Sequence, residues 1–300
     1  MRRDRPVTEP RPTYGASGYQ RVLDADLHPP PAPLREHGQV DYGTGGIPRA
    51  RYLDPAYLRL EMERLWPRVW QMACREEHVA EAGRVVVYEI GDLSLLVVRG
   101  SDGTIRAFHN SCLHRGTQLR TTDGAVETLR CPFHGFTWSL DGTLCELPCA
   151  WDFPHVDPAD LRLPEARVGT WGGFVFVNPD PDAISLDEYL GSLPEHFARF
   201  PLDDRYTAAH VARVLECNWK VGLEAFIEAF HTFAVHPQLV TTSADTITQY
   251  DVLPGERHWS RMVTPVGVPS EHATHDVTDA QILRSMLLTR DDPDLEVPAG

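Results

Sequence analysis

Residues 112–135 read CLHRGTQLRTTDGAVETLRCPFHG, and the cysteines and histidines of this stretch decide how the chain is interpreted. Cys112 and His114 form a C-x-H pair, and after sixteen intervening residues Cys131 and His134 form a C-x-x-H pair. Thiolates and imidazoles at such short spacings are typical of a metal site. Zinc accepts two cysteines and two histidines, but zinc fingers usually keep the cysteines in one pair and the histidines in the other. The stretch therefore predicts a metal centre built from two similar halves.

Each half offers one thiolate and one imidazole, which fits a two-iron cluster better than one zinc ion. In a Rieske [2Fe-2S] centre one iron is bound by two cysteines and the other by two histidines, so two loops must each supply both kinds of ligand. The nearby Gly116, Pro132 and Gly135 suit tight loops between strands. Zinc or a chance grouping is the alternative. The predicted cluster ligands are Cys112, His114, Cys131 and His134.

Short apolar, β-branched runs surround this motif and are separated by glycine and aspartate. The runs RVVVYEI at 84–90 and SLLVVRG at 94–100 are two of several. Runs of this kind are typical of a small antiparallel β domain, which we assign to residues 52–170. We expect an amphipathic helix between Asp54 and Pro67 to open it.

The ends of the chain differ in character from this β domain. Residues 1–51 are predicted to form a proline-rich arm, since eight of the 25 prolines lie in the first 48 residues and no hydrophobic period is sustained there. Residues 171–300 are predicted to form a second domain. Its expected elements are a helical segment at 186–200 that is interrupted at Pro194, a strand at 207–215 and a helix near 280–290.

Composition limits the possible partners and location. The 300 residues include 28 Lys and Arg against 43 Asp and Glu, and the resulting net charge of −15 disfavours nucleic acid as a partner. Because no run approaches eighteen apolar residues, we expect no membrane span. Six cysteines are too sparse for a disulfide scaffold in a chain of this length, so a reducing, cytoplasmic location is expected.

A second chemical signal is the stretch NWKVGLEAFIEAFHTFAVHP at 218–237. Its apolar residues recur with the period of a helix, and Asn218 is suited to cap the start, so the pattern predicts a buried helix of about three turns ended by Pro237. On such a helix Glu224, Glu228 and His231 would share a face, and His236 would lie just beyond its end.

Two histidines and a carboxylate with open positions form the facial triad of non-haem Fe(II) oxygenases. The spacing H-x4-H is weak evidence alone, but the cluster motif upstream makes iron the better interpretation. His231 and His236 are therefore candidate iron ligands.

The cluster stretch, from FHNSCLHRGTQL at 108–119 to CPFHGFTWSLDGTL at 131–144, resembles the Rieske domain of a known family. This family is the large (alpha) subunits of Rieske non-haem iron aromatic-ring-hydroxylating oxygenases. Residues 218–237 look like the mononuclear-iron motif of the same family. Respiratory Rieske proteins carry an extra cysteine in each loop, where this chain has Thr117 and Phe133, so the oxygenase type is favoured.

The resemblance implies an α+β fold, with a small all-β Rieske domain and a partial catalytic domain built on an antiparallel sheet with helices. It implies that His231 and His236 bind a mononuclear Fe(II). Glu228 matches the acidic residue that passes the electron from a Rieske histidine of a neighbouring subunit. The family often has Asp at this position, and Ala225 and Phe230 stand where Asn and Tyr are frequent, so hydrogen bonding around the iron is expected to differ.

The implied function is hydroxylation of an aromatic or similar apolar substrate with O2. NADH-derived electrons would come from a reductase or ferredoxin, and the implied assembly is a homotrimer or a multiple of one, with or without a small beta subunit. One alternative is a monooxygenase or demethylase acting on a non-aromatic substrate such as a quaternary amine. Another is a truncated Rieske electron-transfer protein without catalysis of its own.

The third iron ligand of the family is an Asp more than a hundred residues after the histidine pair, whereas only 64 residues follow His236. We interpret the chain as a fragment of a longer product. A different carboxylate, such as Asp251, Asp276 or Asp279, is the alternative ligand, and we name no third ligand.

Overall fold

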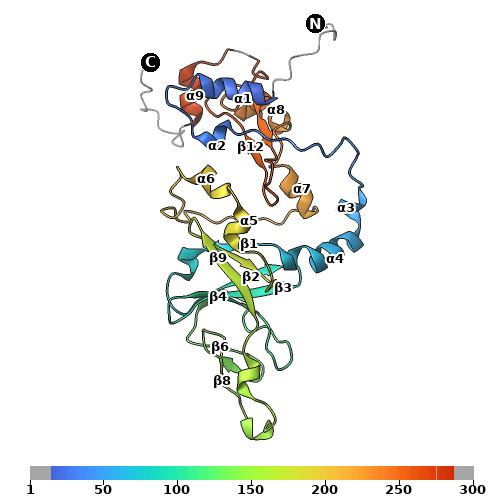
Figure 1. Ribbon diagram of the computed structural model, residues 1–300, viewed down its shortest axis with the longest axis vertical. Coiled ribbons are helices and arrows are strands. Elements are labelled where there is room, and N and C mark those ends of the chain that lie inside the picture. Colours follow the sequence, from blue (N-terminus) through green and yellow to red (C-terminus); the bar gives the residue numbers. More distant parts are fainter. Residues whose placement is uncertain (1–14, 275, 287–300) are drawn as a thin grey trace. The chain divides into compact units, whose positions relative to one another are not determined.

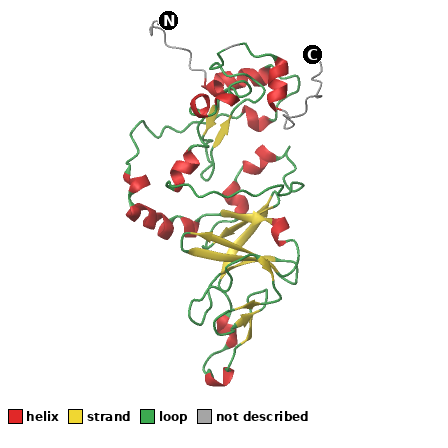
Figure 2. Ribbon diagram, turned by 180° about the vertical axis from the view of Figure 1, so that it is seen from behind, coloured by secondary structure: helices red, strands yellow, loops and turns green. Residues whose placement is uncertain are grey.

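The computed structural model describes residues 15–274 and 276–286, and its contacts divide the chain into two compact units. The central unit is Ile47–Arg213, and the terminal unit combines Met1–Gly46 with Val214–Gly300. The long strands belong to the central unit, whereas the terminal unit consists mainly of short helices and loops (Figures 1 and 2). The mixture of helices and antiparallel sheet confirms the predicted α+β class. The proposed domain limits 1–51, 52–170 and 171–300 stay a prediction.

A seven-stranded antiparallel sheet forms the core of the central unit, in the order β1-β10-β9-β4-β3-β2-β5. The predicted strands at 84–90 and 94–100 are confirmed as β2 and β3, which pair from Val85 opposite Val98 to Ile90 opposite Leu93. The strands are β1 Gln71–Arg75, β2 Arg84–Ile90, β3 Leu93–Arg99, β4 Ile105–His109, β5 Gly124–Ala125, β9 Glu165–Trp171 and β10 Phe174–Asn178.

Strand β3 separates two hydrophobic clusters. Leu95 and Val97 point into one cluster and Leu96 and Val98 into the other, and all four side chains are fully buried. Successive side chains of a strand point to opposite faces, so an uninterrupted apolar run is what a strand buried on both faces requires. The second cluster also contains Trp138 and the two cysteines of the predicted metal centre.

A separate three-stranded sheet carries the second half of the Cys/His motif. Its strands are β6 Leu129–Arg130, β7 Thr137–Trp138 and β8 Leu144–Glu146. Figure 1 shows this sheet at one end of the central unit, below β4. The predicted helix after Asp54 is confirmed as α4, since Asp54 accepts a hydrogen bond from the amide of Ala56 and Pro55 begins the first turn. The helices here are α3 Ala50–Leu53, α4 Pro55–Arg64, α5 Leu186–Leu190, α6 Leu193–Phe197, η1 Trp66–Arg68, η2 Glu76–Val79, η3 Ala150–Asp152 and η4 Pro158–Leu161.

The terminal unit joins the two ends of the sequence around a short hairpin. In this hairpin Tyr250 lies opposite Met262 and Asp251 opposite Arg261. Helix α1 packs so closely that a Cβ at Gly18 would lie 2.6 Å from a methyl carbon of Ile247, which explains the glycine. The elements are α1 Gly15–Asp24, α2 Ala32–Arg35, α7 Trp219–Glu224, α8 Thr232–Val235, η5 Pro237–Leu239, η6 Asp245–Ile247, β11 Gln249–Asp251, β12 Arg261–Val263 and α9 Asp279–Met286.

The predicted three-turn buried helix after Asn218 is wrong. Asn218 does cap α7, but α7 ends at Glu224, and the side chains of Leu223, Phe226 and Phe230 are 52%, 79% and 75% exposed. The physical reason is that the amides of residues 229–231 bond to side chains, which compete with the helical carbonyls.

Three weaker predictions had different outcomes. The helical stretch at 186–200 is confirmed as α5 and α6, but the break lies at Gly191 and not at the expected Pro194, which a helix tolerates in its first turn. The strand at 207–215 is wrong, since these residues are exposed and irregular and have no ladder partner within the described chain. The helix at 280–290 is confirmed to Met286, and its last four residues lie outside the described residues.

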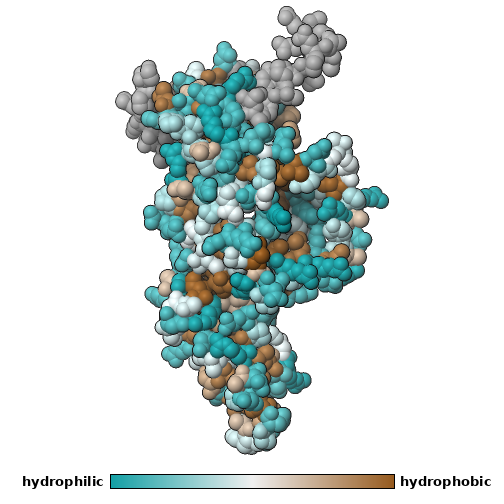
Figure 3. Space-filling model, in the orientation of Figure 1, coloured by the Kyte–Doolittle hydropathy of each residue, from teal (hydrophilic) through white to brown (hydrophobic). Residues whose placement is uncertain are grey.

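The molecular surface is mostly hydrophilic on the face drawn in Figure 3, with apolar side chains in small scattered patches. This agrees with the acidic composition. Among the described residues there is no helix with the length and hydrophobicity needed to cross a bilayer.

Candidate functional site

Two loops of the central unit hold the predicted cluster ligands, and their backbones follow one hydrogen-bond pattern. In the first loop the amide of Cys112 donates to the carbonyl of Thr117 at 2.8 Å, and the amide of Gly116 donates back to Cys112 at 2.9 Å. In the second loop the corresponding bonds, Cys131 to Phe136 and Gly135 to Cys131, measure 2.8 and 3.1 Å. The two halves of the motif therefore form equivalent loops.

The four predicted ligands converge across these loops. The imidazole rings of His114 and His134 lie 4.7 Å apart, centroid to centroid, at 70° to each other. The thiols of Cys112 and Cys131 are buried and interact with each other. The histidines are exposed, so the thiols occupy the inner side of the site and the imidazoles its outer side.

Backbone amides act on both thiols, those of His114 and Arg115 on Cys112 and those of Phe133 and His134 on Cys131, and the two thiols also hydrogen-bond to each other. Burial raises the pKa of Cys112 above its usual value. Burial also acts to raise the pKa of Cys131, but hydrogen bonds from the amides of His134 and Phe133 outweigh it and hold this pKa below its usual value. Metals bind the thiolate form, and the backbone amides of both loops favour that form.

This donor set fits a [2Fe-2S] cluster better than a single ion. A tetrahedral zinc ion needs four ligands around one point. No group of three or more Cys, His, Asp or Glu side chains in the described ranges is arranged to hold a single ion. A Rieske cluster requires only two protein ligands at each iron, one thiol pair and one imidazole pair, and the loops supply these pairs.

Asn110, which the sequence analysis did not single out, braces the first loop. Its side-chain oxygen accepts the amides of Leu119 and Arg120 at 2.9 and 3.1 Å. Its amide group donates to the Ser94 hydroxyl at 2.9 Å and to the Arg120 carbonyl. Because the side chain is buried and uses both its oxygen and its nitrogen, it joins the loop firmly to β3. The feature of the sequence that could have indicated this role of Asn110 is its position two residues before the predicted ligand Cys112.

The second predicted site lies in the terminal unit, at the turn between α7 and α8. The imidazole rings of His231 and His236 lie 5.3 Å apart at 74°. The Glu228 carboxylate forms a short hydrogen bond with Nδ1 of His231 and also accepts the amides of Phe230 and His231. The hydrogen bond from His231 is the main cause that holds the pKa of Glu228 below its usual value.

This arrangement suits His231 for metal binding. Metal-binding histidines usually donate one ring nitrogen to a carboxylate, which fixes the tautomer and leaves the other nitrogen for the metal. With Nδ1 engaged by Glu228, the Nε2 atom of His231 remains for an ion. Glu224, which was expected on the same face, ends α7 instead.

The described residues bring no third ligand to the two histidines. Asp251, one of the carboxylates considered, is fully buried and ion-paired to Arg261 at 2.7 Å. Its oxygens also accept hydrogen bonds from Gln249 and the amide of Gly38. Through these bonds Asp251 stabilises the hairpin of β11 and β12. Asp279 begins α9, and Asp276 precedes it in a loop.

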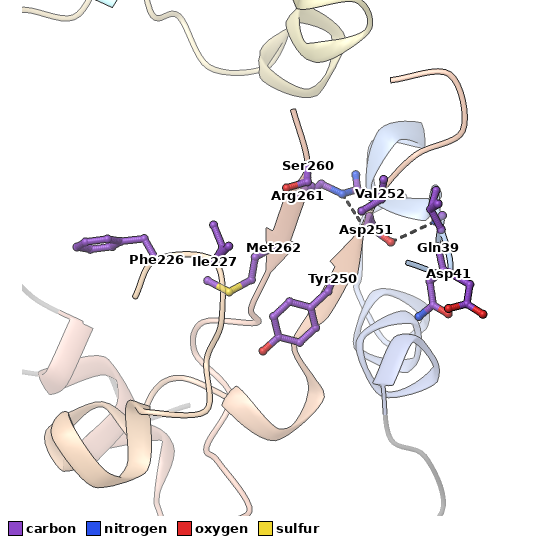
Figure 4. A pocket seen from close by; sticks show the side chains of 12 residues that line it. Gln39, Asp41, Phe226, Ile227, Tyr250, Asp251, Val252, Ser260, Arg261 and Met262 are labelled. Carbon is purple, nitrogen blue, oxygen red and sulfur yellow. Dashed lines mark hydrogen bonds and ion pairs between the residues drawn. The ribbon is translucent and has the colours of Figure 1, made fainter. Parts of the chain in front are cut away.

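Tyr250 approaches the histidine turn from the hairpin and was not identified from the sequence. Its hydroxyl accepts the amide of Ala229 at 3.0 Å, and its ring stacks on Phe230 with centroids 6.0 Å apart. Figure 4 shows Tyr250 projecting from β11 into a cavity of about 910 Å³ that Phe226 and Ile227 also line. A single tyrosine in a short strand carries no motif, so the sequence offered no signal.

Comparison with known proteins identifies both regions. Residues 69–157 match the Rieske [2Fe-2S] domain, and residues 195–294 match the ring hydroxylating alpha subunit (catalytic domain), which binds mononuclear iron in this family. The glycine betaine monooxygenase oxygenase subunit of Chromohalobacter salexigens is 33% identical over 211 residues, which cover 70% of this chain and 46% of the relative.

Two further relatives agree. The carnitine monooxygenase oxygenase subunit of Escherichia coli is 31% identical over 194 residues, 64% of this chain and 52% of the relative. The solved naphthalene 1,2-dioxygenase of Rhodococcus sp. bound to indole superposes with a TM-score of 0.59 at 31% identity, over 65% of this chain and 46% of that one. The chain thus spans about half the length of the curated relatives it matches. It belongs to the alpha subunits of the Rieske non-haem iron oxygenase family.

Proposed function

We propose that the chain forms part of an oxygenase that takes single electrons into a [2Fe-2S] cluster and delivers them to a mononuclear Fe(II), where O2 oxidises a small organic substrate. The observation that carries this proposal is the pair of equivalent loops, which bring two buried thiols together on one side and two exposed imidazoles on the other. When bound, the cluster supplies electron transfer and the Fe(II) supplies O2 activation.

The residues divide this work between them. Cys112 and Cys131 would hold the inner iron of the cluster, and His114 and His134 the outer one. The exposed imidazoles give electrons a route to and from the solvent side. His231 and His236 would hold the Fe(II), with Glu228 keeping the His231 proton on Nδ1.

The electron donor and the assembly belong to the same proposal. A reductase or ferredoxin supplies NADH-derived electrons at the imidazole side. The enzyme forms a homotrimer or a multiple of one, in which Glu228 would hydrogen-bond to a cluster histidine of a neighbouring subunit and so lie on the electron's path to the iron at His231 and His236. A small beta subunit is an optional further component. We also propose that the substrate is a free small molecule and that the reaction takes place in the cytoplasm. Neither nucleic acid nor a membrane takes part in it.

For the substrate we favour a quaternary amine over an aromatic compound. Two similar relatives are monooxygenases of glycine betaine and of carnitine. The cavity beside the histidine turn is lined by Tyr250, whose ring projects from β11, by Phe226 and by Asp41, whose carboxylate is exposed. Aromatic faces and carboxylates are the groups that attract a quaternary ammonium ion.

Aromatic hydroxylation is the second candidate. It is supported by the 31% identity with naphthalene 1,2-dioxygenase and by the side chains of Ile227 and Met262 in the same cavity. An apolar ring would contact these side chains without needing a carboxylate.

The deciding experiment begins with metal content. Anaerobically purified protein should contain three irons and two acid-labile sulfides per chain, with a Rieske EPR signal on reduction. Two irons and two sulfides with the same signal would leave this chain as an electron-transfer protein only. Zinc without sulfide would overturn the proposal.

Substrate class is then tested in single turnovers. Protein reduced with dithionite, freed of excess reductant, is mixed with O2 and either glycine betaine, carnitine, biphenyl or naphthalene, and products are identified by mass spectrometry. Loss of a methyl group or gain of one oxygen atom on a quaternary amine supports the first candidate. Oxygenated rings alone would support the second. His236→Ala, which keeps the cluster, is the control that must give no product.

A further inference from the structure

Three consecutive amides at the histidine turn bond to side chains instead of to helical carbonyls. The amides of Phe230 and His231 donate to the Glu228 carboxylate, and the amide of Ala229 donates to the Tyr250 hydroxyl. Glu228 belongs to the turn itself, whereas Tyr250 comes from a hairpin strand 21 residues away in sequence. Tyr250 is therefore a link between this turn and the rest of the terminal unit.

We propose that Tyr250 is a positioning residue for the mononuclear iron site, which holds the Glu228–His231 turn in its ligand-binding conformation through the hydroxyl bond to Ala229 and the ring contact with Phe230. The inference rests on the proposed function, because it assigns Tyr250 to the iron site described there.

The bond to Ala229 is hard to replace. Ala229 is only 5% exposed, so its amide has little access to water if the hydroxyl is removed. A buried amide without a partner is costly, and the backbone is expected to shift to satisfy it. The backbone would then shift at Ala229. This residue lies between Glu228 and the amides of Phe230 and His231, which the Glu228 carboxylate binds.

The hydroxyl is also kept in its neutral form. Burial is the main cause that raises the pKa of Tyr250; the bond from the Ala229 amide acts against it, and the Glu228 and Asp245 carboxylates act with it. The phenol therefore stays protonated throughout the physiological pH range. The ring contact adds a second restraint, because the Phe230 and Tyr250 rings lie nearly parallel, at 23°.

Tyr250 is a firm support because its neighbour Asp251 anchors the strand. Alternate residues of a strand point to opposite sides, so Tyr250 contacts the histidine turn while Asp251 accepts the amide of Gly38, next to Gln39 (Figure 4). Asp251 is fully buried and binds the Arg261 guanidinium at 2.7 Å and Nδ1 of His37 at 2.9 Å. The Asp251–Arg261 ion pair holds β11 in place from one side of the strand. Tyr250, on the other side of β11, is therefore held in position to bind the histidine turn.

The test compares Tyr250→Phe, Tyr250→Leu and Tyr88→Phe in the full chain. Tyr250→Phe removes the hydroxyl and keeps the ring, whereas Tyr250→Leu removes both restraints. Tyr88→Phe is the matched control, because it removes a half-buried hydroxyl that donates to the Gln71 side chain at 3.0 Å in the central unit. Two quantities are measured: the affinity for Fe(II) beyond the cluster irons, by anaerobic titration, and amide hydrogen exchange of residues 226–232 in protein without that iron.

We expect Tyr250→Phe to weaken Fe(II) binding about 10-fold and Tyr250→Leu up to about 100-fold, the range known for groups that orient metal ligands. Exchange at residues 226–232 should become at least severalfold faster in both variants. Neither quantity should change in Tyr88→Phe, and the Rieske EPR signal should be the same in all proteins. Loss of that signal in Tyr250→Phe would count against the inference, since it would indicate general unfolding.

The exchange measurement separates this inference from the proposed function. If the unsubstituted protein binds no iron beyond the cluster, the proposed oxygenase site fails in this chain, and exchange alone decides whether Tyr250 holds the turn. Unchanged exchange at residues 226–232 in Tyr250→Phe overturns the inference in either case. Faster exchange with unaltered Fe(II) affinity also overturns it, because the turn would then not govern metal binding.

Discussion

Gly116 and Gly135 have the same backbone conformation, with φ of 76° and 78°, and each donates its amide to the carbonyl of the cysteine four residues before it. A positive φ of this size is easily reached only by glycine. The two glycines therefore allow both loops to turn back on their cysteines in the same way. The two halves of the predicted metal centre thus have the same loop conformation, although the sequences that flank them differ.

Replacing Gly135 by Ala should destabilise the second loop and reduce cluster content. The left-handed conformation costs a non-glycine residue about 1–2 kcal/mol, and the new Cβ would lie 3.0 Å from the Arg130 guanidinium. The control is Gly103→Ala, whose φ of 80° imposes the same strain but whose Cβ would meet nothing within 4 Å. We expect similar losses in the free energy of unfolding, measured with urea, and a loss of Rieske absorbance only in Gly135→Ala. Equal absorbance in both variants would contradict a special role of the loop.

The two iron sites should lose their metal independently. The predicted ligands of each site belong to a different compact unit, so one site can empty while the other unit stays folded. His134→Ala should abolish acid-labile sulfide and the Rieske EPR signal while Fe(II) binding outside the cluster persists. His236→Ala should do the reverse. Loss of the same iron in both variants would show that the assignment of these histidines to separate sites is wrong.

Removing the Asp251 carboxylate should strongly destabilise the terminal unit. Asp251→Ala removes the carboxylate that pairs with the Arg261 guanidinium, whose side chain is 10% exposed and which keeps its hydrogen bonds to the carbonyls of Pro33 and Glu36. Breaking a buried pair by removing one member typically costs about 3–5 kcal/mol, whereas replacing both members by apolar residues is often nearly neutral. Urea unfolding should therefore show a large loss for Asp251→Ala and partial recovery for Asp251→Leu combined with Arg261→Met. A loss below about 1 kcal/mol for Asp251→Ala would show that the pair contributes little.

Asp141 should contribute stability that depends on pH. Hydrogen bonds from the Ser139 hydroxyl and the Thr143 amide lower the pKa of Asp141 to about 2. The folded-state pKa lies below the unfolded value of about 3.9, so the carboxylate stabilises the turn between β7 and β8 above about pH 4. This contribution is lost as the pH falls toward about 2. Asp141→Asn should be less stable than the unsubstituted protein at pH 7, and the difference should shrink between pH 5 and 3 in urea unfolding. A difference that is constant over this range would exclude the carboxylate charge as its cause.

Much of the central unit could be predicted because its signals are local. The strands at 84–90 and 94–100 follow from continuous apolar, β-branched runs, which fit β3 and its two buried faces. The helix after Asp54 follows from its cap and Pro55. The placement of Cys112 beside His114 and of Cys131 beside His134 follows from their spacing in two hairpin-like loops, since each of these pairs spans only a few residues. The convergence of the two loops, by contrast, depends on how the sheets pack together.

The terminal unit shows why periodicity is an incomplete guide. Residues 219–230 have the spacing of a long buried helix, but the Glu228 carboxylate and the Tyr250 hydroxyl accept amides that a helix would have used. The Tyr250 hydroxyl is 21 residues away in sequence from the Ala229 amide that it accepts, so the spacing of apolar residues within 219–230 does not reveal this bond. The strand expected at 207–215 failed for a related reason, since a β-branched run pairs only where a neighbouring strand is present.

The sequence by itself determined the ligand types, their spacing and the strands beneath them, because thiols, imidazoles, glycines and caps act within a few residues of their own position. The tertiary structure alone decided which distant groups brace the sites. Asn110 bonds to Ser94 on β3, Tyr250 meets Ala229, and Asp251 joins Arg261 to His37 near the other end of the chain. Such bonds form only when separate segments pack together, and burial then makes each of them expensive to lose.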